Sequence, residues 1–304
     1  MTSSGNPTPV PGVAPGGVWA ILPDRFPAIT ALLARGETAA RPQAPKARQA
    51  ASVAVIPVFG VLTHRPSLLS MMLGGSTTVE IASAVRQAAA SARASSIVLD
   101  IDSPGGSVDG VQELAEVIAR AARHKPVIAV ANSTAASAAY WLASQASEIV
   151  VTPSGMVGSI GVIAMHTDRS RAEDAAGRTH TIVQSSRYKS EGNPYRPLDT
   201  EAHAEVQRMV DSYHNDFLAA VAAGRGVSVA KVRSGFGEGR MLRAKDAIKA
   251  GMVDRIASMD GVLRSQLDGS GMGATRHRGH LDARRAAVVE QAKADLARLC
   301  AADD

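Results

Sequence analysis

Cysteine, aromatic residues and long apolar runs are scarce or absent in this sequence. Its 304 residues include one cysteine, Cys300, which excludes an internal disulfide and a metal site built from several cysteines. Aromatic residues make up 3% of the chain, so the core is expected to consist mainly of Ala, Val, Ile and Leu. No run of about 18 apolar residues occurs, so the sequence predicts no transmembrane helix.

Residues 2–17 lack the features of a secretory signal peptide. They are rich in Pro, Gly and Ser, with neither a charged n-region nor an apolar h-region. We therefore expect a soluble chain in the cytoplasm. The formal net charge of +5 is spread over the sequence without a block of Lys and Arg, which argues against a nucleic-acid partner.

The pattern of titratable residues predicts neither a metal nor a cofactor. No set of His, Asp and Glu has the spacing of a metal site such as HExxH. Residues 155–161 are rich in glycine but lack the lysine of a phosphate-binding loop. Any chemistry is therefore expected to come from the side chains and the backbone alone.

Composition divides the chain into three parts. Residues 1–52 are expected to form a flexible N-terminal segment with one short helix over 19–35, because the Pro- and Gly-rich start can bury little surface. Residues 53–260 have the regular apolar pattern of a folded domain. Residues 261–304 are expected to form a Gly/Ser linker and an Ala-rich charged helix over 281–299.

Short apolar runs alternate with helix-like segments through the central part. This alternation predicts βαβ units and an α/β fold with a mainly parallel sheet. The expected strands are 53–59, 96–101, 126–131, 148–152, 179–184 and 252–256. The expected helices are 78–92, 108–122, 136–146, 199–223 and 244–250.

Two turns of small residues follow two of the expected strands. The first, Asp102-Ser-Pro-Gly-Gly106, ends in glycines that permit positive φ angles and a close approach of backbone N–H groups to a substrate. The second, Ala135-Ala-Ser-Ala-Ala-Tyr140, places Ser137 at the start of an expected helix, where free N–H groups can stabilise an oxyanion. Together they have the parts of an acyl-transfer site, except for a histidine base.

Each of these motifs alone fits a simpler role. The first turn can be a strand-to-helix connection with Ser107 as a cap, and Ser137 can be a small residue packed in an Ala-rich helix. The order of the motifs is more specific than any one of them. The two turns are followed by the segment 152–162, which contains Gly-Ser-Ile-Gly, and later by Arg187-Tyr-Lys-Ser190.

In this order the motifs resemble the signal peptide peptidase A family, serine peptidases with a Ser-Lys dyad in the ClpP/crotonase superfamily. Within the family the chain is similar to the branch of bacteriophage capsid (head) maturation proteases. The resemblance covers roughly residues 53–258 and extends weakly to 19–23. It implies a ClpP/crotonase-like α/β spiral core of repeated β-β-α and βαβ units, with helical and disordered tails.

The resemblance also implies roles for individual residues. Ser137 is similar to the nucleophile, Lys189 to the general base, and Ser159 to a residue whose hydroxyl orients the lysine. Gly106 and the N–H of Ala138 look like the oxyanion hole. Further candidate contacts with substrate are Gly105, Ser107 and Tyr140.

A lysine can act as a base only when its pKa is lowered from about 10.4, and desolvation in an apolar site does this. Relatives in the superfamily that use Ser-His-Asp leave a histidine base as the competing interpretation. Among the histidines we expect His166, which follows the Gly-Ser-Ile-Gly segment, to lie nearest to Ser137. The membrane peptidases usually have Gly after the serine, whereas this chain has Ala138, whose methyl group slightly narrows the approach of a substrate to Ser137.

These observations favour a soluble Ser-Lys endopeptidase that cleaves scaffold, capsid or portal proteins during phage capsid maturation, with self-cleavage as a further option. A bacterial peptidase that degrades signal-peptide fragments shares the chemistry, but the missing anchor argues against it. A non-catalytic capsid assembly protein and a crotonase-type acyl-CoA enzyme remain as alternatives. The acyl-CoA enzyme needs a carboxylate as acid or base in its pocket, and Asp102 and Asp109 are the carboxylates nearest to the two turns. The resemblance further implies a homo-oligomer in which neighbouring copies can complete each site.

Overall fold

The computed structural model describes residues 17–25, 46–50, 52–66 and 74–268. Several sequence-based expectations lie outside these residues. They are the part of the expected helix over 19–35 that follows Arg25, the linker after residue 268, the helix over 281–299, and Cys300. Within the described residues, no helix combines the length and the apolar character needed to cross a bilayer.

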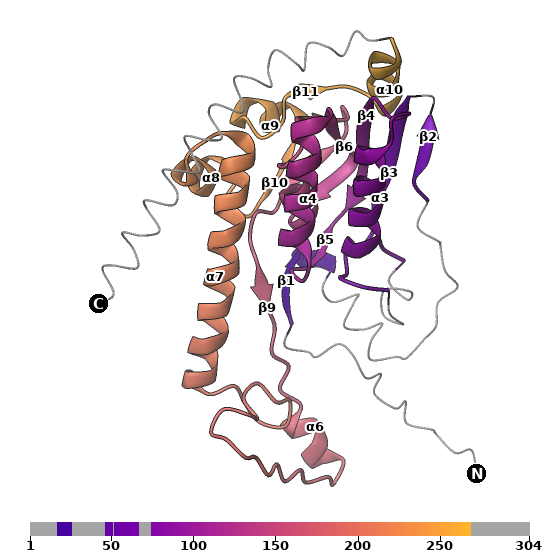
Figure 1. Cartoon of the computed structure of the whole chain (residues 1–304). Coiled ribbons are helices and arrows are strands. Elements are labelled where there is room, and N and C mark those ends of the chain that lie inside the picture. The colour runs from indigo at the N-terminus through magenta and orange to yellow at the C-terminus, as the bar shows by residue number, and fades with distance from the viewer. Residues whose placement is uncertain (1–16, 26–45, 51, 67–73, 269–304) are drawn as a thin grey trace, which may run out of the picture.

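A mostly parallel sheet forms the centre of the molecule (Figure 1), which confirms the predicted α/β class. Its strands follow the order β10-β8-β6-β4-β3-β2, and β6 also pairs with β7, which in turn pairs with β11. The β2–β3 and β10–β8 pairs are antiparallel, and the others are parallel. The strands are β2 Arg48–Ala50, β3 Val53–Phe59, β4 Ser96–Ser103, β6 Val127–Ala136, β7 Glu148–Val151, β8 Met156–Gly158, β10 Met241–Arg243 and β11 Arg255–Ile256.

The central strands are apolar on both faces because both faces are covered. On one face, side chains of β3, β4 and β6 share a core with most of the helices. On the other face, a smaller cluster of valines and Ile128 packs against Val262 of α10. The helices are α3 Thr78–Ala90, α4 Val111–His124, α5 Ala138–Ala143, α6 Ser170–Ala175, α7 Thr200–Arg225, α8 Val229–Gly235, α9 Ala244–Ala250 and α10 Met259–Leu267.

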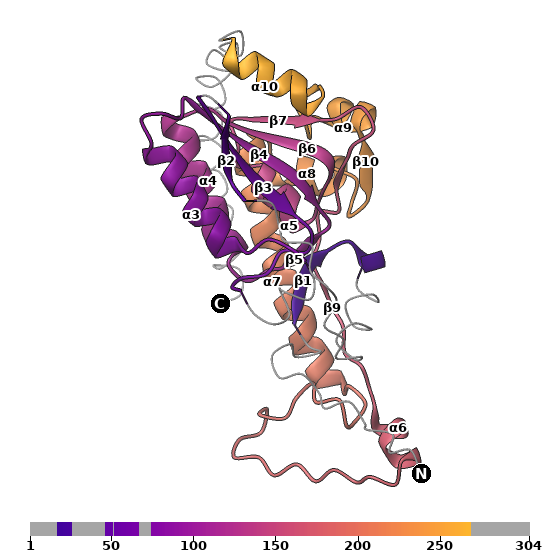
Figure 2. The ribbon, with the colours of Figure 1, turned by 90° about the vertical axis from the view of Figure 1, so that its right-hand side faces the viewer.

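A second, small sheet lies at the end of the main sheet where β4 and β6 terminate (Figure 2). Its order is β5-β1-β9, with β1 Val18–Ile21 in the middle, β5 Gly105–Ser107 on one side and β9 Ile163–Ala164 on the other. Both pairings are antiparallel. A single 3-10 turn, η1 Pro23–Arg25, follows β1 and has no buried residue.

Residues 165–199, which we call the arm, join β9 to α7 and extend away from the rest of the molecule (Figures 1 and 2). The arm contains α6, and most of its side chains are exposed. The lower part of α7 projects in the same direction. We call the two sheets and the helices packed on them the body. The nearly continuous apolar packing of the body does not extend to the arm.

Three sequence-based expectations differ from the structure. Val18–Ile21 form a strand instead of the start of a helix, because four apolar residues find two strand edges to pair with. Residues 179–184 form no strand: Ile182 and Val183 are 46% and 93% exposed, in a stretch with no strand pairing. Helix α10 continues past residue 260, where a linker is expected, and Val262 is fully buried.

A stacked aromatic pair anchors α7 to α5, the helix that follows Ser137. The rings of Trp141 and Phe217 are 4.7 Å apart at their centroids and 13° from parallel. We expect Phe217→Ala to lower the free energy of unfolding by about 3–5 kcal/mol, because it removes the stacking and leaves a cavity. Urea denaturation measures this. Val79→Ala, at an exposed position of α3, should change it by less than about 0.5 kcal/mol; equal losses would contradict this account.

Candidate active site

Ser137 lies at the corner where β6 ends and α5 begins. Its backbone has φ 53° and ψ −120°, a conformation that costs a residue other than glycine about 1–3 kcal/mol. Two backbone hydrogen bonds hold the corner: Ser137 N–H donates to the Gly158 carbonyl over 2.8 Å, and Trp141 N–H donates to the Ser137 carbonyl over 2.9 Å. The strand ends around the corner therefore impose this conformation.

The Ser137 hydroxyl is buried and faces the connection between β8 and β9. It donates a hydrogen bond to the carbonyl of Gly161 over 3.2 Å, and the residue has no exposed surface in the single chain. A carbonyl oxygen accepts this proton in a hydrogen bond but cannot remove it at neutral pH. No basic side chain of the described residues bonds to the hydroxyl, so the corner presents a serine that still needs its base.

The glycine turn of the first motif packs directly against this corner. Gly105 has φ +95°, and a Cβ atom placed on it would lie 3.0 Å from the Cβ of Ser137. A Cβ atom on Gly106 would lie 1.9 Å from the carbonyl oxygen of Leu62. Both positions therefore require glycine, because backbone atoms approach too closely for any side chain. The structure brings the two turns together, as the sequence predicts.

The Ser103 hydroxyl holds the glycine turn in place through two hydrogen bonds. The Gly105 N–H donates to the Ser103 hydroxyl over 3.1 Å, and that hydroxyl donates to the Gly60 carbonyl over 2.6 Å. The Gly105 carbonyl accepts from Leu62 N–H over 2.9 Å. These bonds occupy the N–H and C=O groups of Gly105. The candidates for stabilising an oxyanion are the N–H groups of Gly106, which is paired with Ala20 of β1, and of Ala138, the first residue of α5.

Ser159 lies in the same segment that receives the Ser137 bonds. It directly follows Gly158 and also has a positive φ, 53°, held by a hydrogen bond from its N–H to the Arg240 carbonyl over 3.0 Å. The residue is 5% exposed. The structure therefore places Ser159 beside the Ser137 corner, but no contact joins its hydroxyl to Lys189.

Lys189 is not brought to Ser137 within one chain. It lies in the arm, exposed to solvent, and its backbone N–H donates to the Ser186 carbonyl over 3.2 Å. The order of the motifs predicts Lys189 as the base but does not determine where the arm carries it. Because the arm points away from the body (Figure 1), the described chain holds Ser137 and Lys189, the two residues of the predicted dyad, apart.

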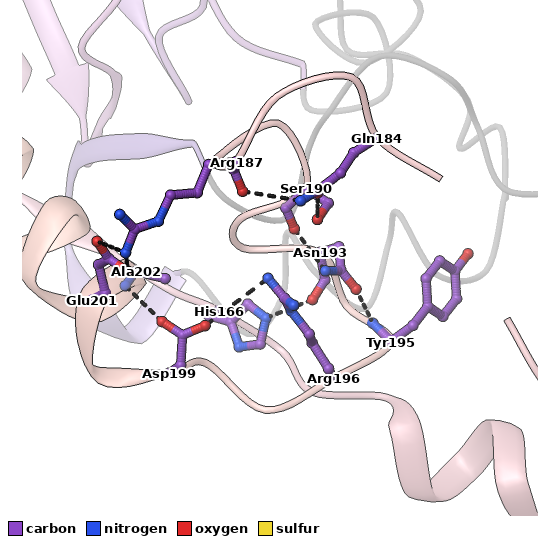
Figure 3. Close-up of polar contacts among 10 residues, drawn as sticks. All are labelled: His166, Gln184, Arg187, Ser190, Asn193, Tyr195, Arg196, Asp199, Glu201 and Ala202. Carbon is purple, nitrogen blue, oxygen red and sulfur yellow. Dashed lines mark hydrogen bonds and ion pairs between the residues drawn. The ribbon is translucent and has the colours of Figure 1, made fainter. Parts of the chain in front are cut away.

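The arm is held together by its own polar contacts, many of which are drawn in Figure 3. Ser190, next to Lys189, donates to the side chain of Gln184, and the Asn193 amide donates to the Ser190 carbonyl over 2.6 Å. At the base of the arm, Arg187 donates to Glu201 of α7 over 2.9 Å. These contacts give the exposed loop a defined shape without a hydrophobic core.

Three expected site residues make other contacts in the structure. The ring of His166 bonds to the Asn193 carbonyl over 3.0 Å inside the arm (Figure 3), so it is not placed to act on Ser137. Tyr140 is fully buried and donates to the Met252 carbonyl over 2.9 Å; burial raises its pKa, so it is a core residue and not a substrate contact. The Ser107 hydroxyl bonds to Asp109 over 2.6 Å, and the residue that caps α4 is Gly110.

A pocket that the sequence does not predict lies next to the acceptor of the Ser137 hydroxyl. It has a volume of about 630 Å³ and is lined by Gly161 and its neighbours and by residues of α7 and α8, among them His214. The Nδ1 atom of His214 is buried, and among the described residues it has no hydrogen-bond partner. Burial, reinforced by the charge of Arg233, lowers the His214 pKa, so the ring is neutral at physiological pH. The sequence indicates only that His214 lies on a long helix.

The close contact at Gly105 yields a test of the site's geometry. Gly105→Ala introduces a methyl group 2.2 Å from the Ala20 carbonyl oxygen, and we expect it to lower the free energy of unfolding by about 1–3 kcal/mol more than a matched glycine change. Gly251→Ala is the matched control: its φ is +82°, but nothing lies within 4 Å of the added atom. Equal losses of stability in urea denaturation would contradict the crowded geometry.

Comparison with known proteins places this site in a protease family. Residues 119–272, half of the chain, match the model of peptidase family S49. The head-tail preconnector protein GP5 of Enterobacteria phage P21 is 34% identical over 67% of this chain and 40% of its own length. The capsid assembly protease C of Escherichia phage lambda is 36% identical over 71% of this chain and 49% of its own length. The chain thus spans half or less of the length of these relatives.

More distant proteins are also similar to this chain. A putative signal peptide peptidase SppA of Enterococcus faecium is 29% identical over 56% of this chain and 49% of its own length. Among solved structures, a membrane protease specific for a stomatin homolog from Pyrococcus horikoshii gives a TM-score of 0.40 at 15% identity, over 71% of this chain and 79% of the other; a score of this size does not define a fold. The resemblance inferred from the motifs is confirmed by the family match: the chain belongs to peptidase family S49.

Proposed function

We propose that this chain is a serine endopeptidase in which Ser137 is the nucleophile and Lys189 the general base. The observation that carries the proposal is the strained Ser137 corner packed against the Gly105–Gly106 turn. A positive φ at a buried serine is maintained only by surrounding structure, and such strain is concentrated at functional sites. The family match to peptidases supports the same chemistry.

In the proposed reaction, neutral Lys189 removes the Ser137 proton while the hydroxyl oxygen attacks the scissile carbonyl. The N–H groups of Gly106 and Ala138 hold the negative charge that develops on the carbonyl oxygen. Lys189 then gives its proton to the leaving amine, which leaves an ester on Ser137. Water attacks the ester as Lys189 takes a proton from the water, and Lys189 then gives that proton to the Ser137 oxygen as the acid product departs.

Lys189 must reach Ser137 for this reaction, and we propose that docking of the arm brings it there. A lysine in water stays protonated at neutral pH, because its ordinary pKa is about 10.4, and burial lowers that value. The exposed Lys189 becomes a base when the arm docks on a body and buries it. We propose that the receiving body belongs to a neighbouring copy in a homo-oligomer, since the arm extends away from its own Ser137 (Figures 1 and 2).

We further propose that the substrates are proteins of a phage head, including scaffold, capsid or portal polypeptides. Two relatives at 34% and 36% identity are a head-tail preconnector protein and a capsid assembly protease, which supports this choice. The similarity to a putative signal peptide peptidase, at 29% identity, keeps signal-peptide fragments as the second candidate substrate. Digestion of both substrate types by the same preparation separates the two.

Removal of either dyad residue should abolish cleavage. We expect intact-mass spectrometry of the chain, incubated alone and with a scaffold protein from the same genome, to show cut products for the unaltered protein and none for Ser137→Ala or Lys189→Ala. Ser133→Ala, an exposed serine of β6, and Lys249→Ala, an exposed lysine of α9, are the matched controls and should cleave normally. Cleavage by Lys189→Ala would show that another group is the base.

A mixing experiment tests whether two copies share one site. Ser137→Ala and Lys189→Ala are each inactive alone, but dissociation and joint reassembly of equal amounts should restore about a quarter of the unaltered activity, as random pairing predicts. The restored rate is measured by the same mass assay. No recovery, in a mixture shown by native mass spectrometry to have exchanged subunits, would mean that each chain uses its own lysine.

A further inference from the structure

Strand β1 lies between two strands that border the candidate active site. Ala20 is opposite Gly106 of β5, and Trp19 is opposite Ile163 of β9. The first neighbour contains the glycine turn, and the second begins two residues after Gly161, the acceptor of the Ser137 hydroxyl. We call the space between β5 and β9 the slot; β1 fills it and pairs with both sides.

The backbone register places one carbonyl of β1 opposite Gly106, one of the two candidate oxyanion donors. Because hydrogen-bonded pairs recur every second residue along an antiparallel ladder, the Ala20 carbonyl is placed to accept from the Gly106 N–H. A Cβ atom on Gly105 would lie 2.2 Å from the Ala20 oxygen and 3.0 Å from Ser137 Cβ, so this oxygen is next to the corner. The bonds that fix the register on either side are Leu22 N–H to the Pro104 carbonyl, 2.9 Å, and Val108 N–H to the Val18 carbonyl, 3.4 Å.

An extended chain in this position has the geometry that a peptidase requires of a substrate. Peptides are often recognised as an added strand, with main-chain bonds for affinity and pockets for alternate side chains. The scissile carbonyl must point at the oxyanion donors. Strand β1 meets the first condition, and its Ala20 carbonyl meets the second for the Gly106 donor, although β1 is part of the same chain.

The side chains of β1 alternate between two environments. Trp19 and Ile21 form a small separate cluster with Val61, Ile163 and Met165 at the slot. Val18 and Ala20 face the main core. A ligand of the slot is therefore an extended apolar segment with a small residue opposite Gly106 and larger apolar residues on either side of it.

We propose that residues 18–21 are an intramolecular ligand of the slot, which occupies the peptide-binding position and must be displaced by substrate. The proposal rests on the proposed peptidase function and deepens it in two ways. It identifies the substrate as an extended antiparallel strand with a small residue at the cut, and it gives the single chain a built-in block of its own site. The η1 turn that follows β1 has no buried residue, so the strand is held by its pairing with β5 and β9 and by its apolar side chains.

Peptide binding without cleavage tests this proposal. In the full chain carrying Ser137→Ala, we expect a fluorescent peptide of the sequence Val-Trp-Ala-Ile-Leu, that of residues 18–22, to compete poorly with β1. The double change Trp19→Ala and Ile21→Ala weakens β1 in its small cluster, and it should tighten binding of the peptide about 10-fold, because a tethered ligand acts at a high effective concentration. Val79→Ala is the control and should leave the affinity unchanged.

A reversible tether provides the second arm of the test. Val18 and Ala164 are opposite one another in β1 and β9, so Val18→Cys with Ala164→Cys, in a Cys300→Ser background, is placed to form a disulfide across the pair. The oxidised form should lose peptide binding at every concentration, and reduction should restore it. A peptide with Asp in place of its alanine should bind neither form.

The outcomes separate the two proposals. Equal affinity in the weakened, control and parent proteins, or peptide binding to the oxidised tether, would show that β1 is only a structural strand, whatever the mass assay finds. If the peptide competes with β1 as expected but the dyad variants still cleave, the slot is a binding site and the assigned chemistry is wrong. If circular dichroism shows that the variant with Trp19→Ala and Ile21→Ala does not fold, the peptide-binding measurements on the disulfide tether decide between the outcomes.

Discussion

The backbone conformation of Ser137 is the constraint around which this site is built. A buried serine at φ 53° requires the end of β6 to be held on both sides, by the Gly158 carbonyl and by the turn into α5. It also requires neighbours without side chains, which explains glycine at position 105 and the short alanines beside the serine. The parallel sheet delivers the ends of β4 and β6 to the same edge, and this is why residues distant in sequence meet there.

The molecule divides the proposed chemistry between a packed body and an exposed arm. The body contains the serine, the glycine turn and the N–H donors in a region with almost no solvent exposure. The arm contains the lysine and is stabilised by polar contacts among its own residues (Figure 3). Such a division makes activity depend on assembly. In the proposal, β1 also blocks the slot until substrate displaces it. Both arrangements would keep the single chain inactive until copies and substrate are present together.

The sequence predicts the parts of the fold that depend on local pattern. Continuous apolar runs identify β3, β4 and β6, and glycine after a helical pattern identifies the end of α9 at Gly251. Strand β1 is missed because four apolar residues are too few to distinguish a strand from a helix, and its partners are distant in sequence. The segment 179–184 is overpredicted, since its apolar residues are exposed in the arm. Motif order predicts that Ser137 and Gly105 lie close together. No local sequence signal shows that Tyr140 faces the core, and none shows where the arm places Lys189.

The central claim is that Ser137 is a nucleophile activated by its surroundings. Its most direct test is covalent labelling with a fluorophosphonate, followed by tryptic mass spectrometry to locate the modified residue. The account predicts one adduct, on Ser137, that forms in the assembled, substrate-cleaving protein and is lost when Lys189 is replaced. An assembled, substrate-cleaving preparation that carries its adduct on another serine, or on none, would contradict it.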